Sequence, residues 1–281
     1  MAPERPIIVI GMHRSGTSML AGLLREAGIY TGRVLGRNDE AFYFRTLNRW
    51  LLAQSGGSWI HPQPIRELLE DAPSRELARE YLEASLKGPR ALSYWGVRGL
   101  LPFRRPSWGW KDPRTTFTLP LWLDLFPEAR VLNMERHGVD VAESLFVRRG
   151  RSAARTAHRF HRRKALYRFV SKKSPLVDTP RLASRDRAFA LWEEYLAQGR
   201  EHMRHLGDQG LSLRYEDFLR DPVRGLARAA GFCGLELGEE RIRELTRHLD
   251  PDRAFAYRAS PELREFAQAH AERLEAYGYT P

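Results

Sequence analysis

The chain has 281 residues, of which 42% are apolar, and its 46 Lys and Arg exceed its 35 Asp and Glu to give a net charge of +11. That length and apolar content exclude a disordered chain and predict one large α/β domain over residues 1–281, with a basic insertion at about 148–178 and a helical part at 239–281. Because no apolar run approaches the roughly 20 residues of a membrane span and a strand begins almost at the N-terminus, we expect a cytoplasmic protein.

The first informative stretch predicts a strand, a loop and a helix. Residues Ile7 to Ile10 are β-branched and apolar, and Pro6 and Gly11 bound them, which is typical of a short buried strand. From Thr17 onward apolar residues recur at helical spacing: Met19, Leu20, Leu23, Leu24 and Ala27.

The loop between that strand and helix suits an anion. Its two glycines let several backbone N–H groups point at one place, and the helix N-terminus adds the positive end of its dipole. Arg14 adds a fork of donors, and Ser15, Thr17 and Ser18 add hydroxyls. The two glycines have the spacing of a nucleotide-triphosphate P-loop, but Thr17 stands where that loop has lysine, which disfavours a triphosphate.

A second informative stretch is Trp108 to Pro113, and it predicts a short strand that ends at Lys111. In a parallel sheet, Lys111 would lie beside the mouth of the first loop, where ligand crevices form. Asp112 and Pro113 form a common helix entry, with Asp112 as the N-cap.

A third strand is expected over 129–134, followed by a helix that begins near Val139. Arg136 at the strand end and Ser144 on the helix are eight residues apart, so both could surround one phosphate. A fourth strand at 211–213 and further helices complete an alternation that predicts a parallel sheet with right-handed crossovers. The single cysteine, Cys233, lies in an apolar helical context, so we expect it to be buried and to form no intrachain disulfide.

Four motifs, in this order, resemble those of sulfotransferases that use 3′-phosphoadenosine 5′-phosphosulfate (PAPS). They are HRSGTS at 13–18, WKDP at 110–113, the Arg136 and Ser144 pair, and RYED at 214–217 with Asp221-Pro222. The resemblance implies a P-loop-like α/β fold with a central parallel sheet flanked by helices. It also implies an enzyme that transfers a sulfuryl group to a hydroxyl or amine without a metal.

The resemblance also implies roles for individual residues. The loop residues His13, Arg14, Ser15, Gly16, Thr17 and Ser18 would hold the 5′-phosphosulfate. Arg136 and Ser144 would bind the 3′-phosphate, and Tyr215 would belong to the nucleotide site. Arg14 and Lys111 would stabilise the charge that develops on the leaving phosphate, because cations aimed at that oxygen lower the barrier to in-line transfer.

The general base is less clear from the motifs. Cytosolic members of the family carry a histidine two residues after the lysine, and this chain has Pro113 there. Other branches use a glutamate after the first helix, which makes Glu40 the candidate, with His13, His61 and Asp112 as alternatives. Asp39 and Glu40 could instead be a solvated helix start.

Two other functions remain open from the sequence. A small-molecule kinase could use Glu135 as its metal-binding acid. A nucleic-acid-binding protein could use Arg148 to Lys173, which holds eleven Lys or Arg and no acidic residue. For a sulfotransferase, this segment would be a solvated insertion, a lid over the nucleotide, or a docking surface for an anionic ligand, an acidic partner or a membrane. The acceptor, whether small molecule, glycan or lipid-like, and the oligomeric state cannot be read from the motifs.

Overall fold

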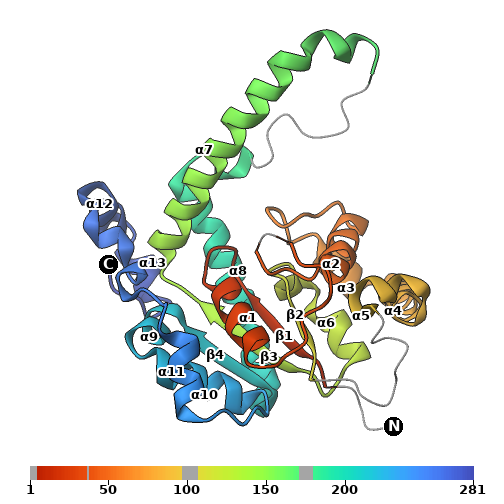
Figure 1. Cartoon of the computed structure of the whole chain (residues 1–281). Helices are drawn as coiled ribbons and strands as arrows, with labels where there is room; N and C mark the ends of the chain where they lie inside the picture. The colour runs from red at the N-terminus through yellow and green to blue at the C-terminus, as the bar shows by residue number, and fades with distance from the viewer. Residues whose placement is uncertain (1–4, 37, 97–106, 171–179) are drawn as a thin grey trace. The chain divides into compact units, whose positions relative to one another are not determined.

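A four-stranded parallel sheet organises the protein in the computed structural model, which describes residues 5–36, 38–96, 107–170 and 180–281. The strands are β1 (Ile7–Gly11), β2 (Gly109–Lys111), β3 (Arg130–Glu135) and β4 (Gly210–Arg214), in the spatial order β2-β1-β3-β4 (Figure 1). All three pairings are parallel, so the predicted parallel sheet is confirmed. The register pairs Val9 with Lys111 and Gly11 with Met134, which brings the carboxyl ends of β1, β2 and β3 to one edge.

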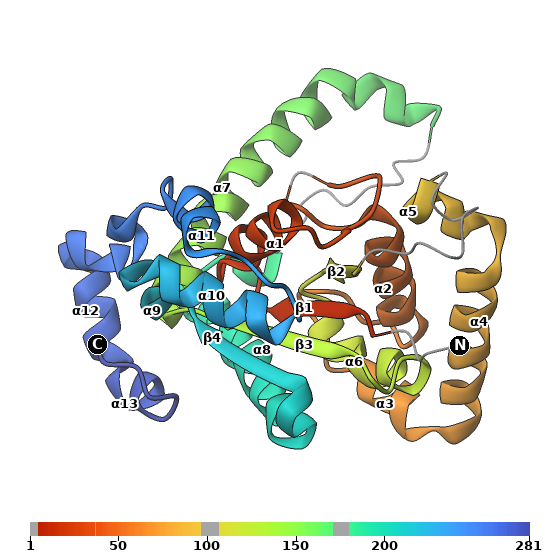
Figure 2. The ribbon, with the colours of Figure 1, turned by 60° about the horizontal axis from the view of Figure 1, so that its bottom comes forward.

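Alternation along β1 divides its side chains between two layers, as a period of two requires. Ile7 and Val9 belong to a core cluster with apolar residues of α1 (Thr17–Glu26), α9 (Tyr215–Arg220), α10 (Pro222–Phe232) and α11 (Glu239–Thr246). Ile8 and Ile10 point the other way and are completely buried. Figure 2 shows the ribbon from a second direction.

An aromatic cluster joins β2 to two of the helices that follow α1. The helices of this part of the chain are α2 (Phe42–Gln54), α3 (Ile65–Glu70), α4 (Ala72–Lys87), α5 (Leu92–Trp95) and α6 (Thr115–Leu125). The Phe44 ring of α2 stacks on Trp110 of β2 with centroids 4.0 Å apart, and Trp122 of α6 meets Trp110 edge to face at 5.1 Å. This packing fixes α2 and α6 against the strand that carries Lys111.

The chain divides into two compact units, the first formed by residues 1–136 and 195–254 and the second by 137–194 and 255–281. The second unit contains α7 (Gly138–Arg163), the first part of α8 (Arg185–Leu206), α12 (Pro261–Ala269) and α13 (Ala271–Glu275). The start of α7 is bonded to the C-terminal segment, because the Tyr257 N–H donates to Asp140 at 2.8 Å and the His137 ring stacks on Tyr257. That the whole chain acts as a single domain stays a prediction.

Two local expectations differ from the structure. Asp112 is not the N-cap of α6, which begins three residues later at Thr115, although its carboxylate accepts the Arg114 N–H as well as bonds from the Arg114 and Asn48 side chains. Residues 148–163 continue α7 instead of forming a loop, since Arg and Ala are strong helix formers and i, i+4 repulsion costs only a few tenths of a kcal/mol. Residues 171–178 of the expected insertion lie outside the described residues.

Among the helices that the structure describes, none is long and apolar enough to cross a membrane.

Candidate active site

The loop after β1 turns sharply through three residues with positive φ. These are Gly11 at 125°, Arg14 at 74° and Gly16 at 96°. Positive φ is easy for glycine and costly for arginine, so Arg14 is held in a strained conformation of a kind that gathers at ligand sites. The Gly11 N–H donates to the Thr116 hydroxyl at 3.1 Å, which ties the loop to the start of α6.

Tyr215 and Arg136 support the other side of this loop. A Cβ at Gly16 would lie 2.3 Å from the Tyr215 ring, so the backbone packs directly on the aromatic face. The Arg136 guanidinium lies 4.5 Å from the centroid of the same ring, and it donates to the Arg14 carbonyl at 3.3 Å and to the Arg253 carbonyl at 3.0 Å. The structure therefore brings Arg14, Gly16, Arg136 and Tyr215 together.

The hydroxyls of the loop have different environments. The Ser15 hydroxyl is buried and donates to the Met12 carbonyl at 2.7 Å, so it braces the turn. The Ser18 hydroxyl donates to the Asn38 carbonyl at 2.9 Å, which joins the start of α1 to the segment that carries Glu40. Thr17 is buried at the first position of α1.

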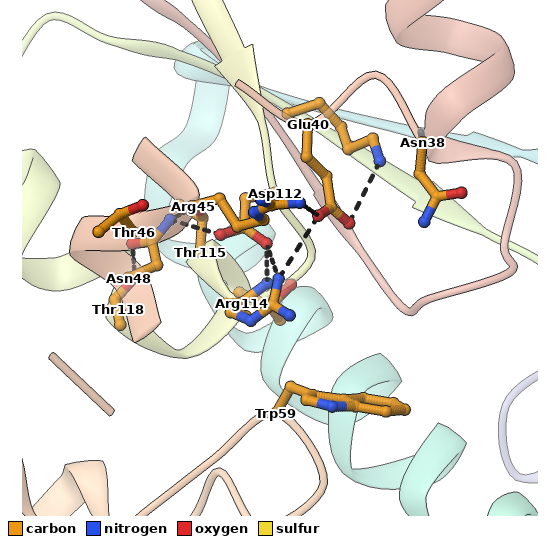
Figure 3. A network of polar contacts seen from close by, with 12 residues as sticks. Asn38, Glu40, Arg45, Thr46, Asn48, Trp59, Asp112, Arg114, Thr115 and Thr118 are labelled. Carbon is orange, nitrogen blue, oxygen red and sulfur yellow. Dashed lines mark hydrogen bonds and ion pairs between the residues drawn. The ribbon is translucent and has the colours of Figure 1, made fainter. Parts of the chain in front are cut away.

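Lys111 and Glu40 lie close together in a buried cluster. Figure 3 shows Glu40 beside Arg45, Asp112 and Arg114. The Lys111 Nζ lies 3.8 Å from Glu40 Oε1, and their side chains are only 2% and 6% exposed. Arg45 and Arg114 both reach the other oxygen, Glu40 Oε2, at 3.7 Å. Three cations thus surround one buried carboxylate.

Burial changes the titration of this lysine. Loss of water around the ammonium lowers the pKa of Lys111 below its ordinary value of 10.5, although the carboxylates of Glu40 and Asp112 oppose the change. The ammonium therefore releases its proton more readily than an exposed lysine does.

Asp39 and Glu40 have separate environments despite being neighbours. Asp39 pairs with Arg25 near the surface, with its side chain 30% exposed. Glu40 is buried among the cations, so the alternative of a solvated helix start is wrong for Glu40.

Asp112 belongs to a buried polar network behind the cluster. Its carboxylate accepts hydrogen bonds from the Arg114 guanidinium at 2.9 Å, the Arg114 N–H at 3.1 Å and the Asn48 amide at 2.9 Å. Asn48 also donates to Thr115, and its oxygen accepts from Thr118 and from Trp122 at 2.8 Å. The network fixes α2, β2 and α6 relative to one another, and it holds Arg114 beside Glu40 (Figure 3).

Arg114 and Asn48 were missed by the sequence analysis. The spacing of Asn48 could have indicated its role, because it stands four residues after Phe44 on the buried face of α2, where a polar side chain needs partners. No feature of the sequence singled out Arg114 except that it is close to Lys111, since an arginine early in a helix is common on protein surfaces.

The alternative bases are placed less favourably. The His13 ring is buried and meets Trp59 edge to face at 4.5 Å, Asp112 is held by Arg114 and Asn48, and His61 is exposed in a short bridge with Ser58. The acid considered for a kinase, Glu135, is buried and paired with Arg200 at 2.7 Å. Ser144 is half-buried on α7 in the second unit, whereas Arg136 belongs to the first, so their joint role stays a prediction.

The sequence profile of the sulfotransferase family matches residues 6–239, which is most of the chain. The protein belongs to this family.

Several solved structures are similar to this chain in fold. A sulfotransferase domain from the curacin biosynthetic pathway is 15% identical, with a TM-score of 0.51 over 94% of this chain and 96% of that one. A sulfotransferase from Alicyclobacillus acidocaldarius is 18% identical, with a TM-score of 0.49 over 97% and 95%. Retinol dehydratase, solved with androsterone and the inactive cofactor PAP, is 21% identical, with a TM-score of 0.40 over 88% and 65%. No relative among the curated proteins matches the chain.

These findings confirm the family, the P-loop-like α/β fold and the enzyme class that the motifs predicted. The roles of the individual site residues stay predictions.

Proposed function

We propose that the protein transfers the sulfuryl group of PAPS to a hydroxyl or amine of its acceptor, with the reaction centred on Lys111 and Glu40. The observation that carries this proposal is the pairing of these two buried side chains at 3.8 Å, at the sheet edge where the loop after β1 begins. A buried cation beside a buried carboxylate provides both a stabiliser of negative charge and a proton acceptor.

The residues of the loop fit an anionic donor. Arg14, the backbone of a turn with three positive φ angles and the N-terminus of α1 are the donor types that bind phosphate and sulfate esters. Arg136 and Tyr215 brace this turn and are the proposed nucleotide ligands, together with Ser144. When bound, PAPS supplies the sulfuryl group on a phosphate leaving group.

Each side chain then has a definite task. Arg14 and Lys111 stabilise negative charge on the leaving phosphate oxygen, which matters most while the bond breaks. Glu40 takes the acceptor proton on Oε1, the oxygen nearer to Lys111, while Arg45 and Arg114 hold Oε2. Arg114 is a positioning residue, because Asp112 fixes it beside Glu40.

The acceptor is proposed as a small molecule, a glycan or a lipid-like compound, and the location as cytoplasmic. The reaction is proposed to need no metal, because a sulfuryl group carries less charge than a phosphoryl group. Turnover that is unchanged by a chelator would support metal independence, and rescue of chelated enzyme by Mg²⁺ would contradict it.

The proposal is tested by incubating the protein with labelled PAPS and a panel of simple phenols, sterols and amines. The formation of labelled product and the release of PAP are measured. Lys111→Ala should lower kcat by about two orders of magnitude while nucleotide affinity changes less, because the lost contact strengthens as charge develops. Lys87→Ala is the matched control, since Lys87 is an exposed lysine paired with Glu83 on α4. Unchanged kcat in Lys111→Ala would contradict the proposal.

A further inference from the structure

The second half of α7 forms a cationic arm that the proposed reaction does not use. We define the α7 arm as residues 147–170, which comprise the end of α7 and the 3-10 turn Lys164–Arg168. Every buried residue of α7 lies at or before Leu145. Beyond that point the helix runs away from the other helices of its own unit (Figure 1).

Arginines line one face of the α7 arm. Their positions follow intervals of three and four residues, which places them in a single stripe along a helix: Arg148, Arg151, Arg155, Arg159 and Arg162. All five are exposed, and the sequence has no Asp or Glu from 144 to 177. Such a stripe repels itself and is complementary to a surface of negative charge.

Exposed apolar side chains gather at the end of the α7 arm. Phe169 is 86% exposed, Val170 53% and Leu166 51%. The backbone N–H groups of Phe169 and Val170 both donate to the Leu166 carbonyl, which keeps the three in one turn beside Lys164 and Arg168. Apolar groups surrounded by cations in this way are typical of segments that enter the interface of an anionic bilayer.

The aromatic residues argue against a nucleic acid as the occupant. The rings of Phe160 and Tyr167 stack on each other at 5.6 Å with an interplanar angle of 14°, so each uses one face within the α7 arm. Phe169 is then the one well-exposed Phe or Tyr ring of the α7 arm, and the leucine and valine beside it give a base nothing to stack on, whereas acyl chains accept all three.

We propose that the α7 arm docks the protein on anionic lipid surfaces, with the arginine stripe on the headgroups and Leu166, Phe169 and Val170 in the interface. Arginine suits this task because its guanidinium binds phosphate and carboxylate groups through two parallel bonds. Docking of this kind would bring the enzyme to the membrane without a spanning helix.

The first test is co-sedimentation of the full chain with vesicles of phosphatidylcholine alone or of equimolar phosphatidylcholine and phosphatidylserine. The proposal predicts binding to the anionic vesicles that weakens as salt rises. Changing Arg151, Arg155, Arg159 and Arg162 to Gln should weaken it by about fivefold for each arginine removed, and Gln preserves helix propensity.

The matched control removes exposed arginines from the first unit, with Arg224, Arg228 and Arg247 changed to Gln. It should bind anionic vesicles within a fewfold of the unchanged chain. Equal losses per arginine in both variants would overturn the proposal, because binding would then follow net charge alone. A retained PAP-induced rise in melting temperature verifies that each variant is folded.

A second test asks whether the tip enters the bilayer. Phe169→Cys can be labelled selectively with an environment-sensitive dye, because the native Cys233 is buried and its pKa is raised to about 12 by that burial. A blue shift of the dye on anionic vesicles supports insertion. No shift, or tighter binding to single-stranded RNA than to vesicles at equal salt, would overturn the lipid surface as the occupant.

Discussion

Lys111 should reveal its burial through the pH dependence of turnover. The protonated form is the one that stabilises the leaving group, and its pKa is lowered by desolvation. Activity should therefore fall as pH rises through a value below 10.5. Between the pKa values of Lys111 in the folded and unfolded states, the unfolded chain binds more protons. The free energy of unfolding therefore rises with pH in that window.

The variant Lys111→Arg should move the alkaline limb of kcat to higher pH, because arginine keeps its proton throughout the accessible range. The pH profile of kcat measures this effect, even if the longer side chain lowers the rate at every pH. An alkaline limb that stays in place would assign it to another group.

Glu40 and Asp39 provide a matched pair for the general base. Glu40→Gln should remove the acidic limb of kcat/KM and lower its plateau by 10²-fold or more, since an amide accepts no proton. Asp39→Asn should leave the limb in place, because Asp39 pairs with Arg25 near the surface. If both variants keep the limb, the base must be sought at His13 or His61.

At the scale of elements, the loop after β1 depends on the glycine at position 16. Gly16→Ala should destabilise the fold by about 2 kcal/mol or more, because φ is 96° and the new Cβ would meet the Tyr215 ring. Gly22→Ala is the control: it lies within α1 with no atom near its Cβ, so it should stabilise by about 0.5–1 kcal/mol. Denaturant melts measure both, and similar changes in the two would show that the loop is not constrained.

The strands were predictable within a residue or two, because apolar runs such as Ile7 to Ile10 are bounded by proline and glycine. The position of the loop after β1 was predictable from its glycines and hydroxyl side chains. The buried network around Asn48 could not be read in the same way, because its partners Asp112 and Trp122 are 64 and 74 residues away. Asp112 shows the same limit, because local sequence predicts a carboxylate near a helix start but does not show that its second oxygen is bonded to Asn48 of another helix.

At the scale of the whole molecule, the sequence predicted charge better than conformation. The position of the basic segment was evident, but its helical state up to Arg163 was not, because repulsion between like charges and the helix propensity of arginine and alanine act in opposite directions. The second unit was also not foreseen. It is formed by contacts such as that between Asp140 and Tyr257, which are 117 residues apart. No local sequence pattern indicates a contact over that separation.

The central claim is that the loop after β1 and the residues that brace it bind a sulfated nucleotide rather than a triphosphate. The most direct measurement is the melting temperature of the protein with PAP in the absence of magnesium, compared with ATP and magnesium. At a hundredfold excess over Kd, PAP should stabilise by about 2.7 kcal/mol and raise the melting temperature by several degrees, and Arg136→Ala should diminish this rise. A larger rise with ATP and magnesium than with PAP would contradict the account.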